Sequence, residues 1–229
     1  MIDITLWCSR PSATQIAWAA AEGVTALNLM VNDASSLRAP SKFEITPGTE
    51  DAAKRIVGAG LALEFTAWAM PHKPYLSEAC DWLTQATVDH GARAVWWDAE
   101  EPWTQAKGGL EPQAAADLID LAGAREGVTG IGYAPTSLDP LLARADLVAP
   151  QAYATTRPGS LSAARIPAVL SGWAKRAPHA EVVPALAGYS QPPNGLGLAW
   201  AAAGRPDRIQ IWALRHMVGR TLLRQIKDA

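Results

Sequence analysis

The sequence has little cysteine and almost no net charge, and each shortage excludes a class of protein. Two cysteines, Cys8 and Cys80, in 229 residues cannot supply a disulfide framework, and their spacing is not that of a metal site. The formal net charge of −2 leaves no basic footprint for nucleic acid or for an anionic membrane surface. We therefore expect neither nucleic acid nor a membrane among the partners.

Targeting segments and the common catalytic signatures are also missing. Residues 1–6 have no basic region followed by an apolar run of signal-peptide length, and no run approaches a membrane span. We expect a soluble chain made in the cytoplasm without a signal peptide. The four histidines are scattered, and no serine lies in a nucleophile elbow. We therefore expect no metal site, no cofactor and no serine triad.

Tryptophan and apolar residues, in contrast, are plentiful. Apolar residues make up 49% of the chain and charged residues 18%, which permits a large core and makes disorder improbable. Ten tryptophans stand against two phenylalanines. A buried indole N–H needs a hydrogen-bond partner, so tryptophan is a costly core filler. We expect several tryptophans to face a ligand and the others to lie in the core.

Short apolar runs alternate with helical patterns from end to end. The expected strands are 2–8, 25–31, 61–69, 93–98, 129–133, 147–153, 181–186 and 208–214. The expected helices are 12–22, 49–59 capped by Thr49, 77–91, 112–124, 137–144, 162–176, 198–203 and 218–227. Eight such units without a linker predict one monomeric α/β domain over residues 1–229, a parallel (β/α)8 TIM barrel. A doubly wound open sheet is the alternative, but residues 7–11 lack its glycine-rich turn.

The fourth expected strand ends in a cluster of acids. Side chains alternate along a strand, so Asp98 and Glu100 should share a face while Glu101 points away. Their Cα atoms should lie about 6.6 Å apart. Two carboxylates that close in a water-poor place resist ionising together, which produces an acid and a base side by side. The indoles of Trp96, Trp97 and Trp103 should surround the pair and provide flat surfaces on which a sugar ring can stack.

These two acids are the candidate catalytic groups. Desolvation and the charge of Asp98 should raise the pKa of Glu100, which can then protonate a glycosidic oxygen. Asp98 should stay ionised and stabilise the positive charge that develops on the sugar. The alternative is that both acids pair with Arg93 or another arginine, or cap the next helix. Glu101 is expected to be a surface acid.

Polar and aromatic residues gather at the other strand ends, where barrel active sites lie. Gln151 and Tyr153 share a face and suit the carbonyl of an N-acetyl group; a tyrosine satisfied by a loop carbonyl is the alternative. Trp212 or Trp68 either stacks against a sugar ring or belongs to the core. Glu64 lies on the same strand face as Trp68, further from the strand end, and is expected to be a buried acid. The remaining candidates for substrate binding are Trp7, Asn32, Asp33, Tyr133 and Tyr189.

The motif Asp98-Ala99-Glu100, with Gln151-Ala152-Tyr153 and Trp212, resembles the glycoside hydrolase clan of family 25 lysozymes and family 18 chitinases. Family 18 ends its fourth strand in Asp-x-Glu and uses a tyrosine on strand six and a tryptophan on strand eight. Trp7 and Cys8 stand where family 25 carries an aspartate. Val95 and Trp96 replace further family 18 aspartates.

The resemblance implies a lysozyme-like muramidase or a related hexosaminidase, without cofactor, acting on peptidoglycan or a chitin-like polysaccharide. An endolysin that reaches the cell wall by a non-signal route fits this size. With Asp98 and Glu100 as the only acids in reach, the substrate's own N-acetyl group would attack, held by Asp98 and Tyr153. Two alternatives remain: a catalytically silent glycan-binding barrel, and a metal-dependent hydrolase using Asp33, Asp98 and Glu100.

Overall fold

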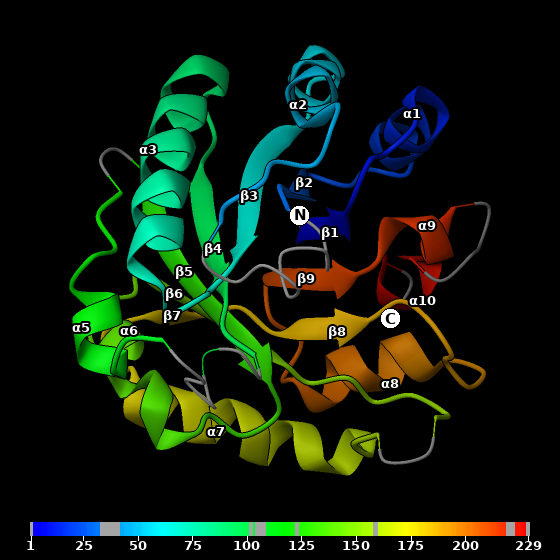
Figure 1. The fold of residues 1–229 in the computed structure, drawn as a ribbon. Coiled ribbons are helices and arrows are strands. Elements are labelled where there is room, and N and C mark those ends of the chain that lie inside the picture. Colours follow the sequence, from blue (N-terminus) through cyan, green and yellow to red (C-terminus); the bar gives the residue numbers. More distant parts are fainter. Residues whose placement is uncertain are drawn as a thin grey trace.

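The chain forms a closed barrel of parallel strands (Figure 1). The computed structural model describes residues 2–32, 42–100, 103, 109–121, 124–157, 160–218 and 223–227. Neighbouring strands pair in the order β5-β4-β3-β2-β1-β9-β8-β6-β7, and pairing of β5 with β6 closes the ring. The predicted (β/α)8 barrel is therefore confirmed. Its strands are β1 (Asp3–Cys8), β2 (Ala26–Met30), β3 (Ala62–Trp68), β4 (Ala94–Asp98), β5 (Arg125–Ile131), β6 (Leu147–Gln151), β7 (Glu181–Val182), β8 (Ala185–Ala187) and β9 (Arg208–Trp212).

The seventh strand of the barrel is interrupted. Both β7 and β8 pair with β6, and Pro184 lies in the gap between them. Proline has no N–H to donate to a ladder, so pairing breaks there. β7 and β8 are therefore two pieces of the single strand expected at 181–186, which is why an eight-stranded barrel carries nine strand labels.

Helices surround the barrel on its outside (Figure 1). They are α1 (Ala13–Ala21), α2 (Thr49–Gly58), α3 (Lys73–His90), α5 (Pro112–Ala116), α6 (Asp139–Leu142), α7 (Ile166–Arg176), α8 (Gly195–Ala202), α9 (Leu214–Met217) and α10 (Arg224–Lys227), with single 3-10 turns at Thr136–Leu138 and Ala163–Arg165. Ser12 and Gln15 form a reciprocal capping box at the start of α1, as a serine before an apolar pattern predicts. None of the helices in the described ranges is long and apolar enough to cross a membrane.

Several expected boundaries were wrong, for local reasons. Helix α3 begins at Lys73 rather than Ser77, because Pro74 in its first turn has a backbone angle already suited to a helix. The cap of α2 is Gly48 in the left-handed region, and Thr49 is the first helical residue, donating its hydroxyl to the carbonyl of Thr46. Over the described residues α5 ends at Ala116, not at residue 124. Of the expected helix 218–227, the described residues show only α10 at its end, while α9 ends at Met217, just before that range.

The fifth strand also differs from its expected range of 129–133. It covers Arg125–Ile131, so Gly127 lies inside the strand instead of ahead of it. A Cβ atom at Gly127 would stand 2.3 Å from the indole of Trp96. Glycine is needed here because any side chain would collide with the Trp96 ring. Its presence therefore does not end the strand.

Alternation along the strands separates two cores. Trp96 lies in the barrel interior with Ala94, Leu147, Ala149 and Ala185. Trp97 and Trp103 lie in the larger core between the strands and the helices, and the Trp103 N–H donates to the Ser137 carbonyl over 2.8 Å. Only Trp96 of the three expected indoles therefore shares the inward face of strand β4 with Asp98.

A buried charge cluster fills the barrel interior near the N-terminal ends of the strands, which we call the lower barrel. Glu64 is completely buried and accepts hydrogen bonds from Arg93 Nε at 2.8 Å and from Arg208 at 3.0 Å. The Trp96 N–H donates to its second oxygen over 2.7 Å. Arg93 also pairs with Asp3 at 3.0 Å. Arg93 therefore pairs with acids of the lower barrel. It does not pair with Asp98 or Glu100, which lie at the C-terminal ends of the strands, the mouth of the barrel.

A second buried acid, Glu126, lies on the helix-facing side of β5. It is 8% exposed, and its Oε1 atom has no hydrogen-bond partner among the described residues. Burial raises the pKa of Glu126 to about 7, although Arg144, 3.7 Å from its other oxygen, lowers it in part. Asp146 and Asp120 raise the pKa further.

This acid should make stability depend on pH. The folded protein holds the Glu126 proton up to about pH 7, whereas the unfolded chain releases it near the ordinary value of 4.5, so the free energy of unfolding falls as pH rises between them. Glu126→Gln should change stability little at pH 5 and raise it by about 1–3 kcal/mol at pH 8. Urea denaturation at both pH values measures this, with the exposed Glu111→Gln as control. Equal pH dependence in the variant and the wild type would contradict the assignment.

Candidate active site

Asp98 is the deepest acid at the mouth of the barrel. It ends β4, lies opposite Trp68 of β3 and Thr129 of β5, and is 3% exposed. The side-chain amide of Gln151 donates to its Oδ1 over 3.0 Å. Burial raises the pKa of Asp98 well above its usual value, the charge of Glu100 raises it further, and the Gln151 hydrogen bond lowers it. This carboxyl group therefore strongly favours its protonated form.

Glu100 follows two residues later and is less buried than Asp98. Burial raises its pKa, and a hydrogen bond from Gln151 lowers it. One amide thus holds both carboxyl groups, which titrate as a coupled pair. In the free protein burial acts more strongly on Asp98, so Asp98 keeps its proton longer. The sequence predicted the reverse, an ionised Asp98 beside a protonated Glu100.

Tyr153 lies beside the acid pair, on the loop after β6. It packs against the interior cluster around Trp96. Burial raises the pKa of its phenol, and the charges of Asp98, Tyr189 and Glu100 raise that pKa further. Its hydroxyl therefore remains a hydrogen-bond donor at every ordinary pH. The Tyr189 ring meets the Tyr153 ring edge-on at 6.1 Å, and the Arg157 guanidinium stacks over Tyr189 at 4.6 Å. The expected Gln151 and Tyr153 thus lie beside Asp98 and Glu100, and Tyr189 packs against Tyr153.

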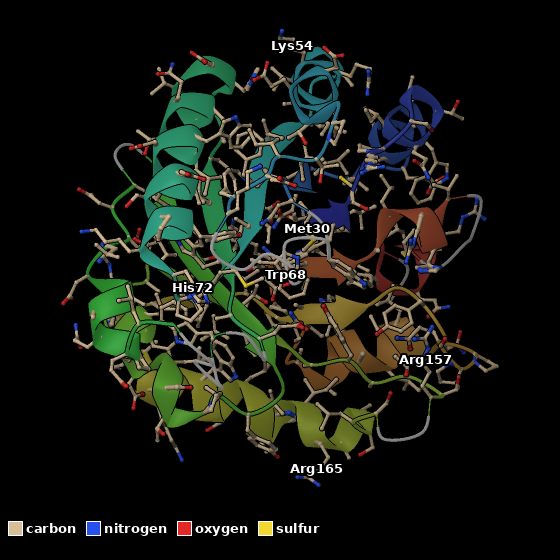
Figure 2. The ribbon with its side chains drawn as sticks, in the orientation of Figure 1. Met30, Lys54, Trp68, His72, Arg157 and Arg165 are labelled. Carbon is tan, nitrogen blue, oxygen red and sulfur yellow. The ribbon has the colours of Figure 1, made fainter. Side chains whose placement is uncertain are left out.

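An aromatic hollow of about 410 Å³ includes Trp68, which is the register partner of Asp98 on the neighbouring strand. Trp7, Trp68 and Trp212 line it. The Trp7 and Trp212 rings meet edge-on at 5.1 Å, and the Trp7 N–H donates to Gln210 over 2.8 Å. In Figure 2 Trp68 and Met30, which also lines the hollow, lie together near the centre of the strand ring. Trp68 and Trp212 are partly exposed and Trp7 is buried beneath them.

The other candidates lie elsewhere. Asn32 is buried and joins β2 to β3: its Oδ1 accepts a hydrogen bond from the backbone N–H of Trp68 at 3.1 Å, and its side-chain amide donates to the Tyr75 hydroxyl. Tyr133 is 49% exposed and accepts a hydrogen bond from Arg165, which Figure 2 places on the outside of the barrel beside α7. Asp33 and Glu101 lie outside the described residues.

Sequence reasoning missed the arginines of this region. Arg10 and Arg215 line the aromatic hollow, and Arg157 covers Tyr189. Arg10 and Arg157 lie in loops and Arg215 in the single turn of α9, so no hydrophobic periodicity marks them. A usable signal was present, because Arg10 and Arg215 each follow a strand-end tryptophan, Trp7 or Trp212, by three residues.

The described residues offer no evident metal-binding group. They contain no cluster of three or more histidine, cysteine, aspartate or glutamate side chains that could hold a metal ion. The hydrogen bonds from Gln151 are formed by an amide N–H, which donates to carboxylates and cannot ligate a cation. The described surroundings of Asp98 and Glu100 suit proton exchange with an organic substrate.

The fold is similar to those of several solved glycosidases. A GH18 chitinase from Pseudoalteromonas aurantia is 11% identical over 99% of both chains, with a TM-score of 0.66. A chitinase from Bacteroides thetaiotaomicron is 10% identical over 94% of this chain and 90% of its own, with a TM-score of 0.68. The spore cortex-lytic enzyme SleL of Bacillus cereus is 10% identical with a TM-score of 0.55; the match covers 81% of this chain and 51% of SleL.

These similarities confirm the predicted resemblance at the level of the fold. No protein-family model and no curated protein matches the sequence. Because one barrel fold supports many chemistries, the arrangement of Asp98, Glu100, Gln151 and Tyr153 has to carry the functional argument.

Proposed function

We propose that the chain is a glycoside hydrolase that cleaves N-acetylhexosamine-containing polysaccharide, with peptidoglycan as its substrate and cell-wall degradation as its role. The observation that carries the proposal is the Asp98–Glu100 pair, held by Gln151 at the barrel mouth next to Tyr153 and an aromatic hollow. Structural neighbours described as chitinases and as a spore cortex-lytic enzyme support this reaction class.

Glu100 is the proton donor in this mechanism. It is the more accessible of the two acids, and burial raises its pKa, which favours the protonated form that a general acid needs. The proton that Asp98 holds in the free protein passes to Glu100 when substrate binds. An N-acetyl N–H that donates to Asp98 favours the ionised form of Asp98 and so drives this transfer.

The substrate's own acetamido group is the nucleophile. Glu64, the next acid down the barrel interior, is occupied by Arg93 and Arg208 and lies too deep to reach a sugar. The Tyr153 hydroxyl donates to the acetamido carbonyl, whose oxygen bonds to the anomeric carbon as the glycosidic bond breaks and Glu100 protonates the leaving oxygen. Glu100 then takes a proton from a water molecule as the water oxygen attacks the anomeric carbon, and the bond from that carbon to the acetamido oxygen breaks, which gives net retention.

Digestion of two purified polymers tests this function. Peptide-free peptidoglycan strands and chitin oligomers are incubated with the protein, and mass spectrometry identifies the new reducing ends. We expect N-acetylhexosamine ends from peptidoglycan strands, formed faster than from chitin, and inhibition by a thiazoline mimic of the oxazolinium ring. Binding without cleavage would overturn the proposal in favour of a silent glycan-binding barrel. Loss of cleavage with chelator would overturn it in favour of a metal-dependent hydrolase.

A further inference from the structure

Two arginines stand at the edge of the aromatic hollow. Arg10 follows Trp7 by three residues in the loop after β1, and Arg215 follows Trp212 by three residues after β9. Trp7 and Trp212 are partners in the register of these neighbouring strands. The loop after β1 and the start of α9 therefore lie next to each other, and both arginines line the hollow whose walls include Trp68.

The charges of the mouth are divided between its two sides. Both catalytic carboxyl groups belong to the end of β4, and Trp68 on β3 stands in register with Asp98 between them and the hollow. The guanidinium groups of Arg10 and Arg215 belong to the side of β1 and β9, and both side chains are exposed. Arg215 is steadied by a 3.3 Å hydrogen bond from its Nε to His216 Nε2. A cationic edge on an aromatic hollow complements an anionic group attached to a sugar ring.

We propose that Arg10 and Arg215 form a carboxylate-binding subsite, which receives an acidic substituent of the sugar seated over Trp212 and Trp68. The proposal rests on the proposed function, since it assigns this subsite to the same cleft. Arginine matches a carboxylate with two parallel N–H donors, and a tryptophan face holds the sugar ring beside it. A carboxylate can form charge-assisted hydrogen bonds with both guanidinium groups and a neutral substituent cannot, so this edge selects acidic sugar chains.

Two sources can supply that carboxylate in peptidoglycan: the lactyl group of the sugar and the peptide attached to it. The test therefore uses three forms of the strand: peptide-free strands with free lactyl carboxylates, the same strands neutralised by coupling to methylamine, and strands with intact peptides. The wild-type kcat/KM for each is compared with those of Arg10→Gln and Arg215→Gln.

Arg205→Gln is the matched control. Arg205 has a φ of 53°, the same as Arg10, but it stacks over Trp200 just before β9, at the opposite end of the barrel. Replacing it removes a positive charge at an equally unusual backbone position without touching the hollow. Its ratio of activities on acidic and neutralised strands should equal that of the wild type.

We expect the wild type to prefer the acidic strands and each variant at the hollow to lower that preference about tenfold, as for the loss of one charge-assisted hydrogen bond. Added salt should also weaken the preference, because both arginines are exposed. An arginine-dependent preference for peptide-bearing over peptide-free strands would also support the subsite and assign the carboxylate to the peptide.

Equal wild-type activity on acidic and neutralised strands would overturn the subsite, as would an equal loss in Arg205→Gln. If no strand is cleaved, the affinity for the strands tests the subsite instead. Calorimetry with the acidic and neutralised strands should show the same arginine-dependent preference, so failure of hydrolysis and failure of the subsite remain distinguishable.

Discussion

Replacing Glu100 with glutamine should lower the rate of glycan cleavage by roughly 10²–10⁴-fold while leaving the fold and sugar binding intact. Glutamine has the shape of a protonated glutamate and can keep the contact with Gln151, but it has no proton to give to a leaving oxygen. The rate is measured on peptide-free peptidoglycan strands, binding by calorimetry, and folding by circular dichroism.

The control for this variant is Glu111→Gln, an exposed acid at the start of α5. It changes the same functional group outside the mouth and should cleave at the wild-type rate. Glu101→Gln should also be nearly silent if Glu101 is the surface acid that strand alternation predicts. A Glu100→Gln enzyme that keeps more than about a tenth of the rate would remove Glu100 from the role of general acid.

Replacing Glu64 with glutamine should destabilise the protein by about 3 kcal/mol, because it leaves two arginines without their shared buried partner. The Glu64 side chain is completely buried, whereas those of Arg93 and Arg208 are 31% and 15% exposed. Asp3 still pairs with both arginines in the variant and limits the loss. Urea denaturation at pH 7 measures the free energy of unfolding.

Glu181→Gln provides the comparison, because Glu181 also pairs with Arg208, at 3.4 Å, but is 40% exposed. Exposed pairs contribute at most about 1 kcal/mol. If Glu64→Gln cost no more than Glu181→Gln, the buried cluster would not be what holds the lower barrel together. The cluster also explains why Glu64 is not a catalytic base, since Arg93 and Arg208 hold its fully buried carboxyl group away from any substrate.

The sequence was informative wherever strand alternation decided the outcome. Asp98 faces inward with Trp96 because the two are two residues apart, and Trp97 faces the helices for the same reason. Alternation could not say that Glu64 would capture Arg93, because that contact joins residues 29 positions apart on neighbouring strands. Nor could it rank the two acids, because their relative burial depends on how Gln151 and the neighbouring strands close over Asp98.

Boundaries and loop residues were the least predictable parts. The start of the fifth strand was placed too late because Gly127 within it admits the Trp96 ring, which only the packed barrel reveals. Arg10 and Arg215 come together because β1 and β9 are neighbours in the closed ring, although 205 positions separate the two arginines in the sequence. Closure of the barrel, and not any local pattern, creates the cationic side of the hollow.

The anomer released first in the peptidoglycan digestion tests the central claim most directly. If Asp98 and Tyr153 position the substrate's acetamido group as nucleophile, two displacements occur at the anomeric carbon, and proton NMR in the first minutes should show β-anomeric ends from β-linked strands. Slow conversion to the α-anomer should follow in solution. Appearance of the α-anomer first would contradict the account, because it would require a water activated by another base instead of attack by the acetamido group.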